Sequence, residues 1–199
     1  MFYKTENGNF TGFYEDEDKD GNYTEISIED WQMVLDKQSQ GEIIFYNAKS
    51  KKIDSIKLNQ YETFDGTTLS TDIVAIKKSI LDVLSKLKIE YAQKEFLFQE
   101  KYWQKNRDVD KANLTSIVVM LTATKQTTFP NWKFKDLDGV DVYVHLTTSD
   151  MMSLANIMQT QTTKALITES TLIKKIEALS VEELKKFDSI AEFKALIEV

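Results

Sequence analysis

Cysteine is absent from the 199-residue chain, which excludes disulfide bonds, thiolate metal sites and a cysteine nucleophile. Proline occurs once and glycine six times, so few positions interrupt regular structure and long helices are favoured. Arg107 is the only arginine, and the formal net charge is -7. Because phosphate contacts need clustered basic side chains, this composition disfavours DNA or RNA as a partner.

Long apolar runs are also absent. The first residues, 1–7, contain no apolar signal core, and no stretch approaches the roughly 20 apolar residues of a membrane-spanning helix. Hydrophobic residues make up 42% of the chain, which is enough to form a core. The sequence therefore predicts a soluble protein that stays in a cytoplasm and does not enter a membrane.

The N-terminal part predicts short strands around one helix. Phe10–Tyr14 and Tyr23–Ile26 are strand candidates on either side of an acidic turn. Ser27 suits the N-cap of the following helix, with Asp30 three residues later, and Gly41 suits its C-terminal end.

A hairpin and a linker are expected next. Ile43–Tyr46 and the stretch from Ile53 to Leu58 are strand candidates around a turn, and Thr63–Ser70 resembles a polar linker. A long helix is then expected from Thr71 to Trp103, which would span roughly 50 Å at 1.5 Å per residue. Such a helix would need a second long helix or another chain to cover its apolar seam, whose heptad-like spacing runs through Ile73, Ile76, Ile80, Val83 and Leu87.

The C-terminal part predicts more helices and one hairpin. Asp110 is the expected N-cap of a shorter helix, with Pro130 as its stop. Trp132–Lys135 and Val140–Leu146 predict a hairpin, and Asp138-Gly139 between them is typical of a type I′ turn.

A second long helix is expected from Ser149 to Leu179, and Ser180–Glu183 predicts a capping box for a last helix. The polar middle of the second long helix, Gln159–Lys164, has two interpretations. It sets the register of a helix pair, or it is a solvated face with Met158, Ala165 and Leu166 buried.

The predicted fold class is α+β, with a small β-rich N-terminal module followed by a mainly helical body. The body would hold two long antiparallel helices and one β-hairpin. The expected divisions are a module at 1–66, a helical connector at 67–106, and a C-terminal helical domain at 107–199 with its hairpin at 132–146.

Two features suggest metal chemistry without completing a site. Asp16, Asp18 and Asp20 match the first half of a calcium loop, but Ser27 stands where the loop needs a bidentate glutamate. A solvated acidic turn is therefore favoured over calcium binding. His145, the only histidine, has no second ligand nearby and is interpreted as a strand residue, so no cofactor is expected.

Aromatic side chains cluster near the end of the first long helix, at Tyr91, Phe96, Phe98, Tyr102 and Trp103. Core packing is the commoner reason for such a cluster. A contact surface for a protein partner is the functional alternative.

The motifs Gly12-Phe13-Tyr14, Glu25-Ile26-Ser27 and Gln38-Ser39-Gln40-Gly41 resemble the opening of bacteriophage tail fibre assembly proteins. In that family, a Gly-Phe-Tyr strand precedes a Glu-Ile-Ser helix that ends in Gln-Ser-Gln-Gly.

From Lys77 onward the chain resembles a domain family of unknown function found at the ends of phage and prophage tail proteins. The pattern is a charged helix, a small-residue helix at Leu114–Ala123, then Trp132, the Asp138-Gly139 turn and the Leu146-Thr147 step into a helix. Neither family supplies catalytic residues, and no complete enzyme motif occurs in the chain.

The resemblances imply a tail fibre assembly factor, a chaperone that binds a tail fibre protein in the host cytoplasm. The alternative is a structural component of the virion tail that self-associates through its long helices. A depolymerase enzyme is disfavoured, because that chemistry needs carboxylates on a large β-scaffold. The expected partner-binding residues are Phe13, Tyr14, Trp31, Phe96, Phe98, Tyr102 and Trp103.

Overall fold

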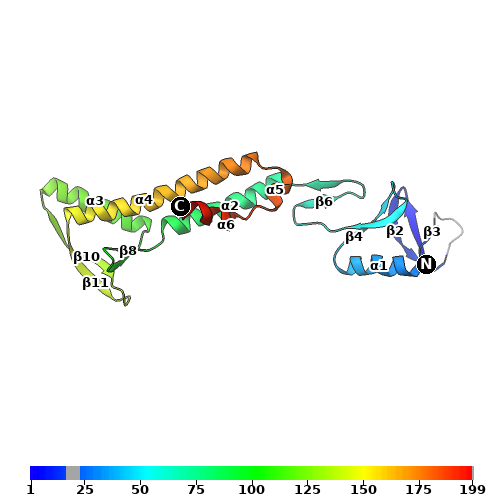
Figure 1. Cartoon of the computed structure of the whole chain (residues 1–199), viewed down its shortest axis with the longest axis horizontal. Helices are drawn as coiled ribbons and strands as arrows, with labels where there is room; N and C mark the ends of the chain where they lie inside the picture. The colour runs from blue at the N-terminus through cyan, green and yellow to red at the C-terminus, as the bar shows by residue number, and fades with distance from the viewer. Residues whose placement is uncertain (17–22, 199) are drawn as a thin grey trace. The chain divides into compact units, whose positions relative to one another are not determined.

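Strands dominate the first part of the chain and long helices the second, which confirms the α+β prediction (Figure 1). The computed structural model describes residues 1–16 and 23–198. The chain divides into two units, Met1–Ala75 and Ile76–Val199, and each is described by itself.

A three-stranded antiparallel sheet opens the N-terminal unit, with strand order β2-β1-β3. The predicted strands at Phe10–Tyr14 and Tyr23–Ile26 are confirmed, and a further strand that was not predicted lies between them in the sheet. Its signal was the dipeptide Asn7-Gly8, whose positive φ angles of 52° and 82° suit a tight hairpin. The strands are β1 (Phe2–Glu6), β2 (Asn9–Tyr14) and β3 (Tyr23–Glu25).

The helix α1 (Ile28–Ser39) follows, with both ends as predicted. The Ser27 hydroxyl accepts a hydrogen bond from the Asp30 N–H at 3.1 Å, and Gly41 has a φ of 82°. Val34 is the buried residue of this helix, which packs on the hairpin of β4 (Ile43–Asn47) and β5 (Lys52–Ile56).

The predicted linker at Thr63–Ser70 is wrong, because a second hairpin forms there from β6 (Glu62–Phe64) and β7 (Leu69–Thr71). The Asp65 carboxylate accepts the N–H groups of Thr67 and Thr68, both at 2.8 Å, and this closes the turn. A polar segment is thus an ordered turn rather than a linker.

The first long helix is shorter than predicted. Helix α2 (Ile73–Ala92) ends 11 residues before Trp103, and the aromatic residues beyond it form a hairpin of β8 (Phe96–Phe98) and β9 (Tyr102–Gln104). Consecutive aromatic residues favour a pleated strand over a helix. At 20 residues, α2 spans about 30 Å, and its buried side chains are Ile76, Ile80 and Leu84.

Helix α3 (Asp108–Thr124) begins earlier than predicted. Its N-cap is Arg107, and Asp110 is the third helical residue, whose carboxylate accepts the Arg107 N–H at 3.1 Å. Lys125 ends the helix with a φ of 56°, and Pro130 lies within the following strand instead of stopping the helix.

The predicted hairpin is confirmed as β10 (Thr128–Lys135) and β11 (Asp141–Thr147). Its turn is wider than predicted, because Gly139 has a positive φ while Asp138 does not, and a type I′ turn needs both. The Asp136 carboxylate instead accepts the N–H groups of Asp138 and Val140. With β8 and β9, the hairpin forms an antiparallel sheet of order β11-β10-β9-β8.

The second long helix is confirmed as α4 (Thr148–Ala178), and α2 packs against it through contacts that include Lys88 with Glu169 and Tyr91 with Gln161. The capping box at Ser180 is confirmed too, but the predicted last helix is two short ones, α5 (Val181–Lys185) and α6 (Ser189–Ile197). Helices α3 and α4 cover one face of the sheet. The core cluster between them and the sheet is formed by Phe98, Leu114, Leu121, Trp132, Phe134, Leu146, Met151, Leu154 and Met158.

Candidate partner-binding groove

The aromatic residues that follow α2 divide between the core and the surface. Phe98 is buried and stacks on Phe134, with ring centroids 5.7 Å apart, and Tyr102 lies 5.1 Å from the same ring. Phe96 is half-buried against this cluster. Three of the predicted contact residues therefore pack in the core of the C-terminal unit.

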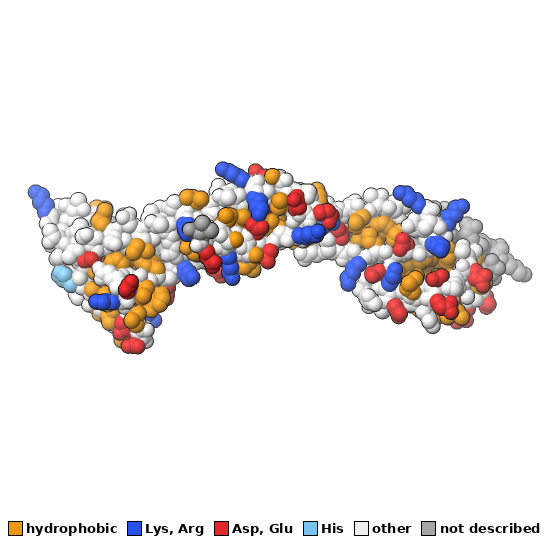
Figure 2. All heavy atoms as spheres, in the orientation of Figure 1, with side chains coloured by type: hydrophobic (Ala, Val, Ile, Leu, Met, Phe, Trp, Pro, Cys, Tyr) orange, Lys and Arg blue, Asp and Glu red, His pale blue; other side chains and the backbone are white. Residues whose placement is uncertain are grey.

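Trp103 points to the other face of the sheet. It is 39% exposed, and its partner across the hairpin, Leu97, is 37% exposed. Trp103 lies opposite Lys135, and Lys135 lies opposite Asp141. Together with Leu97, these residues form one row across all four strands. Figure 2 shows apolar side chains gathered on this sheet.

A groove of about 730 Å³ lies between α3 and the strands β9 and β10. Trp103 and Phe129 supply apolar lining, and Asn113 and Ser116 line it from α3. This volume falls within the range of ligand-binding clefts, roughly 300–1,000 Å³.

Charged side chains surround the groove, mostly in pairs. Arg107 makes a two-pronged contact with Asp110, with nitrogen–oxygen distances of 2.8 and 3.0 Å. The hydrogen bond from Lys133 to Asp141, 2.7 Å long, raises the pKa of the lysine and lowers the pKa of the carboxyl. Lys135 also lines the groove and forms no ion pair within the described residues.

A buried amide side chain lies at the base of the groove. Gln104 is almost fully buried, and its Oε1 accepts a hydrogen bond from the Trp132 indole N–H at 2.9 Å. Its Nε2 donates to the Lys105 carbonyl at 2.7 Å. The hydrogen bond between Gln104 and Trp132 connects β9 to β10 below the groove. The sequence does not indicate which glutamine is buried.

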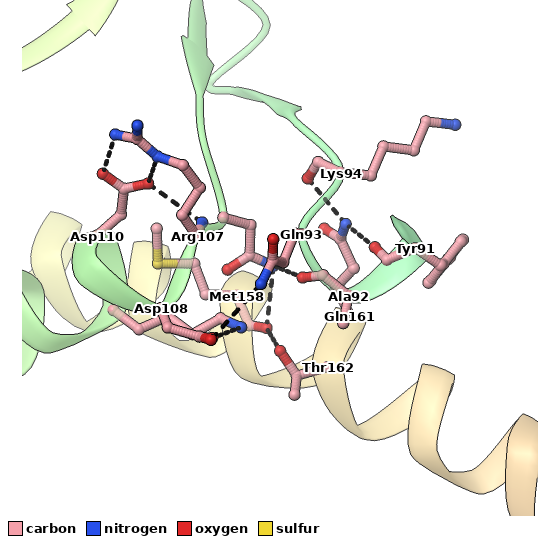
Figure 3. Close-up of polar contacts among 12 residues, drawn as sticks. Tyr91, Ala92, Gln93, Lys94, Arg107, Asp108, Asp110, Met158, Gln161 and Thr162 are labelled. Atoms are coloured by element: carbon pink, nitrogen blue, oxygen red, sulfur yellow. Dashed lines mark hydrogen bonds and ion pairs between the residues drawn. The ribbon is translucent and has the colours of Figure 1, made fainter. Parts of the chain in front are cut away.

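A second set of amides joins the segment after β9 to both long helices. Asn106 is fully buried, and its Nδ2 donates to the carbonyls of Ala92 at 2.8 Å and Met158 at 3.4 Å. Figure 3 shows the Gln161 amide between the carbonyls of Tyr91 and Lys94, at 2.6 and 2.9 Å. These bonds fix the C-terminal end of α2 against α4.

Each interpretation of the polar middle of α4 fits some of its residues: one side chain contacts α2, and others form a solvated face. Gln161 bonds across to α2, while Gln159 and Thr163 bond to each other on an exposed face. Met158 and Ala165 are buried as expected, but Leu166 is exposed. The ion pair between Lys88 and Glu169, 3.0 Å long, adds to the antiparallel pairing of α2 with α4.

The predicted contact residues of the N-terminal unit lie on its sheet and on α1. Phe13 is half-buried, 5.0 Å from the ring of Phe10, and Tyr14 is exposed with an edge contact to Tyr23. Trp31 is half-buried, and its indole nitrogen has no hydrogen-bond partner among the described residues.

The metal candidates do not form a site in the described part of the chain. Asp16 is exposed, whereas Asp18 and Asp20 lie outside the described residues. Within residues 1–16 and 23–198, no three histidine or acidic side chains gather as metal ligands. His145 is an exposed residue of β11.

Comparisons with protein-family models, curated proteins and solved structures give no match to this chain. Over the described residues, no helix has both the length and the apolar character to cross a membrane.

Proposed function

We propose that the chain is a bacteriophage or prophage tail fibre assembly factor that binds a fibre protein before the fibre assembles. The observation that carries the proposal is the exposed Leu97–Trp103 pair beside the groove. Large apolar side chains on a rigid sheet next to a groove are typical of protein-binding surfaces. The resemblance of residues 12–41 to tail fibre assembly proteins suggests that the partner is a tail fibre protein.

A fibre protein needs such a factor for a physical reason. Before assembly, an elongated fibre exposes strand edges and apolar patches, and both favour aggregation. A protein that covers these surfaces keeps the fibre available for assembly. It needs shape and apolar contact at its own surface, which the sheet and groove of the C-terminal unit supply.

Co-expression with the fibre protein tests the proposal. The yield of soluble fibre should rise with the wild-type chain and fall with Trp103→Asp, because a charge replaces the apolar contact. Val119→Asp is the matched control, since Val119 is exposed on α3 and does not line the groove. A fibre yield that is the same with and without the chain would overturn the proposal.

A structural tail component is the second candidate, and exposed apolar side chains on α2 favour it. Val74, Leu81 and Ile89 are all exposed, at positions that a second copy could cover. Sedimentation of the purified chain tests this function. A stable oligomer that Ile89→Glu dissociates supports it, and a monomer at all concentrations argues against it.

A further inference from the structure

Strand β10 has an open edge inside the groove. It pairs with β11 along most of its length. On its other side it pairs with β9 at one position only, where Lys135 lies opposite Trp103. Within the described residues, no other strand covers the edge from Thr128 to Phe134. Pro130 has no N–H, and the register with β11 shifts between Phe129 and Trp132, so the regular part of this open edge is Trp132–Phe134. Asn131 and Lys133 of this segment line the groove.

The hydrogen-bond pattern shows which backbone groups are free. The Asp136 N–H donates to the Val140 carbonyl at 2.9 Å, next to the pair of Lys135 with Asp141. Bonded and non-bonded pairs alternate along an antiparallel ladder. Lys133, opposite Tyr143, is therefore in a non-bonded pair, and its N–H and C=O point away from β11 into the groove.

The surroundings of this edge suit an extended peptide. Trp103 and Phe129 offer apolar contact, and Asn113 and Ser116 offer polar groups from the α3 side. Lys135 brings a positive charge that forms no ion pair within the described residues, since Asp141 opposite it is ion-paired with Lys133 and interacts with Lys135 only more weakly. An incoming strand would gain hydrogen bonds with the N–H and C=O of Lys133 and a charge contact from Lys135.

We propose that the open edge of β10 receives an extended strand of the partner that carries a carboxylate for Lys135. The inference rests on the proposed function insofar as the strand belongs to a fibre protein. The geometry of the edge and its charge specify the ligand chemistry independently of the proposed function. The ligand is an extended acidic segment that adds to the sheet.

A pair of substitutions at one position tests the backbone contact. Lys133→Pro removes the free N–H and blocks an added strand, and proline is tolerated where a strand N–H faces outward. Lys133→Ala is the matched control, because both variants lose the ion pair with Asp141 but only proline loses the donor. Lys133→Pro should weaken binding of the fibre protein tenfold or more relative to Lys133→Ala.

The other free edge of the sheet provides a second control. Tyr143 is opposite Lys133 in the same non-bonded pair, so its N–H points to the outer edge of β11. Tyr143→Pro should leave binding unchanged. If Tyr143→Pro abolishes binding and Lys133→Pro does not, the partner strand adds to β11 and the inference is wrong.

Hydrogen exchange in the wild-type chain does not depend on any variant folding. The probe is a short peptide of alternating valine and threonine with a central glutamate, and the same peptide with glutamine. The glutamate peptide should slow exchange of the Lys133 amide and bind at least threefold more tightly than the glutamine peptide. Unchanged exchange at Lys133 with saturating glutamate peptide overturns the inference.

The two proposals fail in different ways. If the wild-type chain binds the fibre protein and Lys133→Pro binds it equally well, the proposed function stands and the groove inference is wrong. If the wild-type chain does not bind the fibre protein but the peptide protects Lys133, the proposed function is wrong and the strand-binding edge is supported.

Discussion

Single amide side chains organise the C-terminal unit, and the sequence could not show which ones. Gln104, Asn106 and Gln161 have the same chemistry as the exposed amides of the chain. What distinguishes them is that Gln104 and Asn106 are buried and Gln161 is half-buried, and this depends on the packing of segments far apart in sequence. The sequence did mark Gln161 as part of a polar interruption, because it broke an apolar pattern.

Asn106→Ala should lower the unfolding free energy of the C-terminal unit by about 2–3 kcal/mol. The substitution leaves the carbonyl of Ala92 without its donor in a buried place. Urea unfolding followed by circular dichroism measures the change. Asn113→Ala, at an exposed position of α3, should change it by less than about 0.5 kcal/mol, and equal effects of the two variants would refute the role of Asn106.

Asp150 should make the C-terminal unit sensitive to acid. Hydrogen bonds from the Thr147 hydroxyl and N–H, and from Gln99, lower the pKa of the Asp150 carboxyl. A lowered folded-state pKa gives stability above the ordinary value of 3.8, and that stability is lost as the pH falls through the lowered value. The stability difference between the wild type and Asp150→Asn should therefore be largest near neutral pH and shrink in acid. Urea midpoints across this pH range test it, and a difference independent of pH would contradict it.

Among the elements, long helices with clear caps and several strands could be predicted, whereas β1 and the hairpins β6–β7 and β8–β9 could not. Helix α4 and the caps at Ser27 and Ser180 match the sequence patterns closely. The end of α2 could not be predicted, since apolar residues continue past Ala92 with no glycine or proline to stop them. The β8–β9 turn instead places two non-glycine residues, Gln99 and Glu100, at positive φ.

Glu100→Gly should raise the unfolding free energy by roughly 0.5–1 kcal/mol. Glu100 has a φ of 57°, a conformation that glycine adopts without the steric cost of a Cβ atom. Thermal unfolding of the variant measures the gain. Lys101→Gly, next in the same turn but without a positive φ, should not stabilise the chain, and a loss of stability in Glu100→Gly would contradict the argument.

The buried face of α2 gives a direct test of its packing. Ile80 is 7% exposed and Leu81, the next residue, is 38% exposed. Ile80→Asp should cost about 3 kcal/mol or more, because it buries an unpaired charge, while Leu81→Asp should cost about 1 kcal/mol or less. Helicity and urea unfolding measure both, and similar losses in the two variants would argue against a buried seam at Ile80.

At the scale of the whole molecule, charge separates the two units. Met1–Ala75 carries a formal net charge of -8 and Ile76–Val199 a net charge of +1, so the acidic balance of the chain belongs to its first part. This division agrees with the proposal that the groove in the second unit binds a carboxylate. The sequence predicted the fold class correctly, but the groove depends on strand register, which no local pattern in the chain specified.

Quantitative mass spectrometry of tail particles and of lysates during fibre synthesis tests the central proposal most directly. A tail fibre assembly factor should be found in the lysate in complex with the fibre protein and be absent from finished particles. Presence in finished particles at a fixed ratio to the fibre would contradict this and identify the chain as a structural component of the tail.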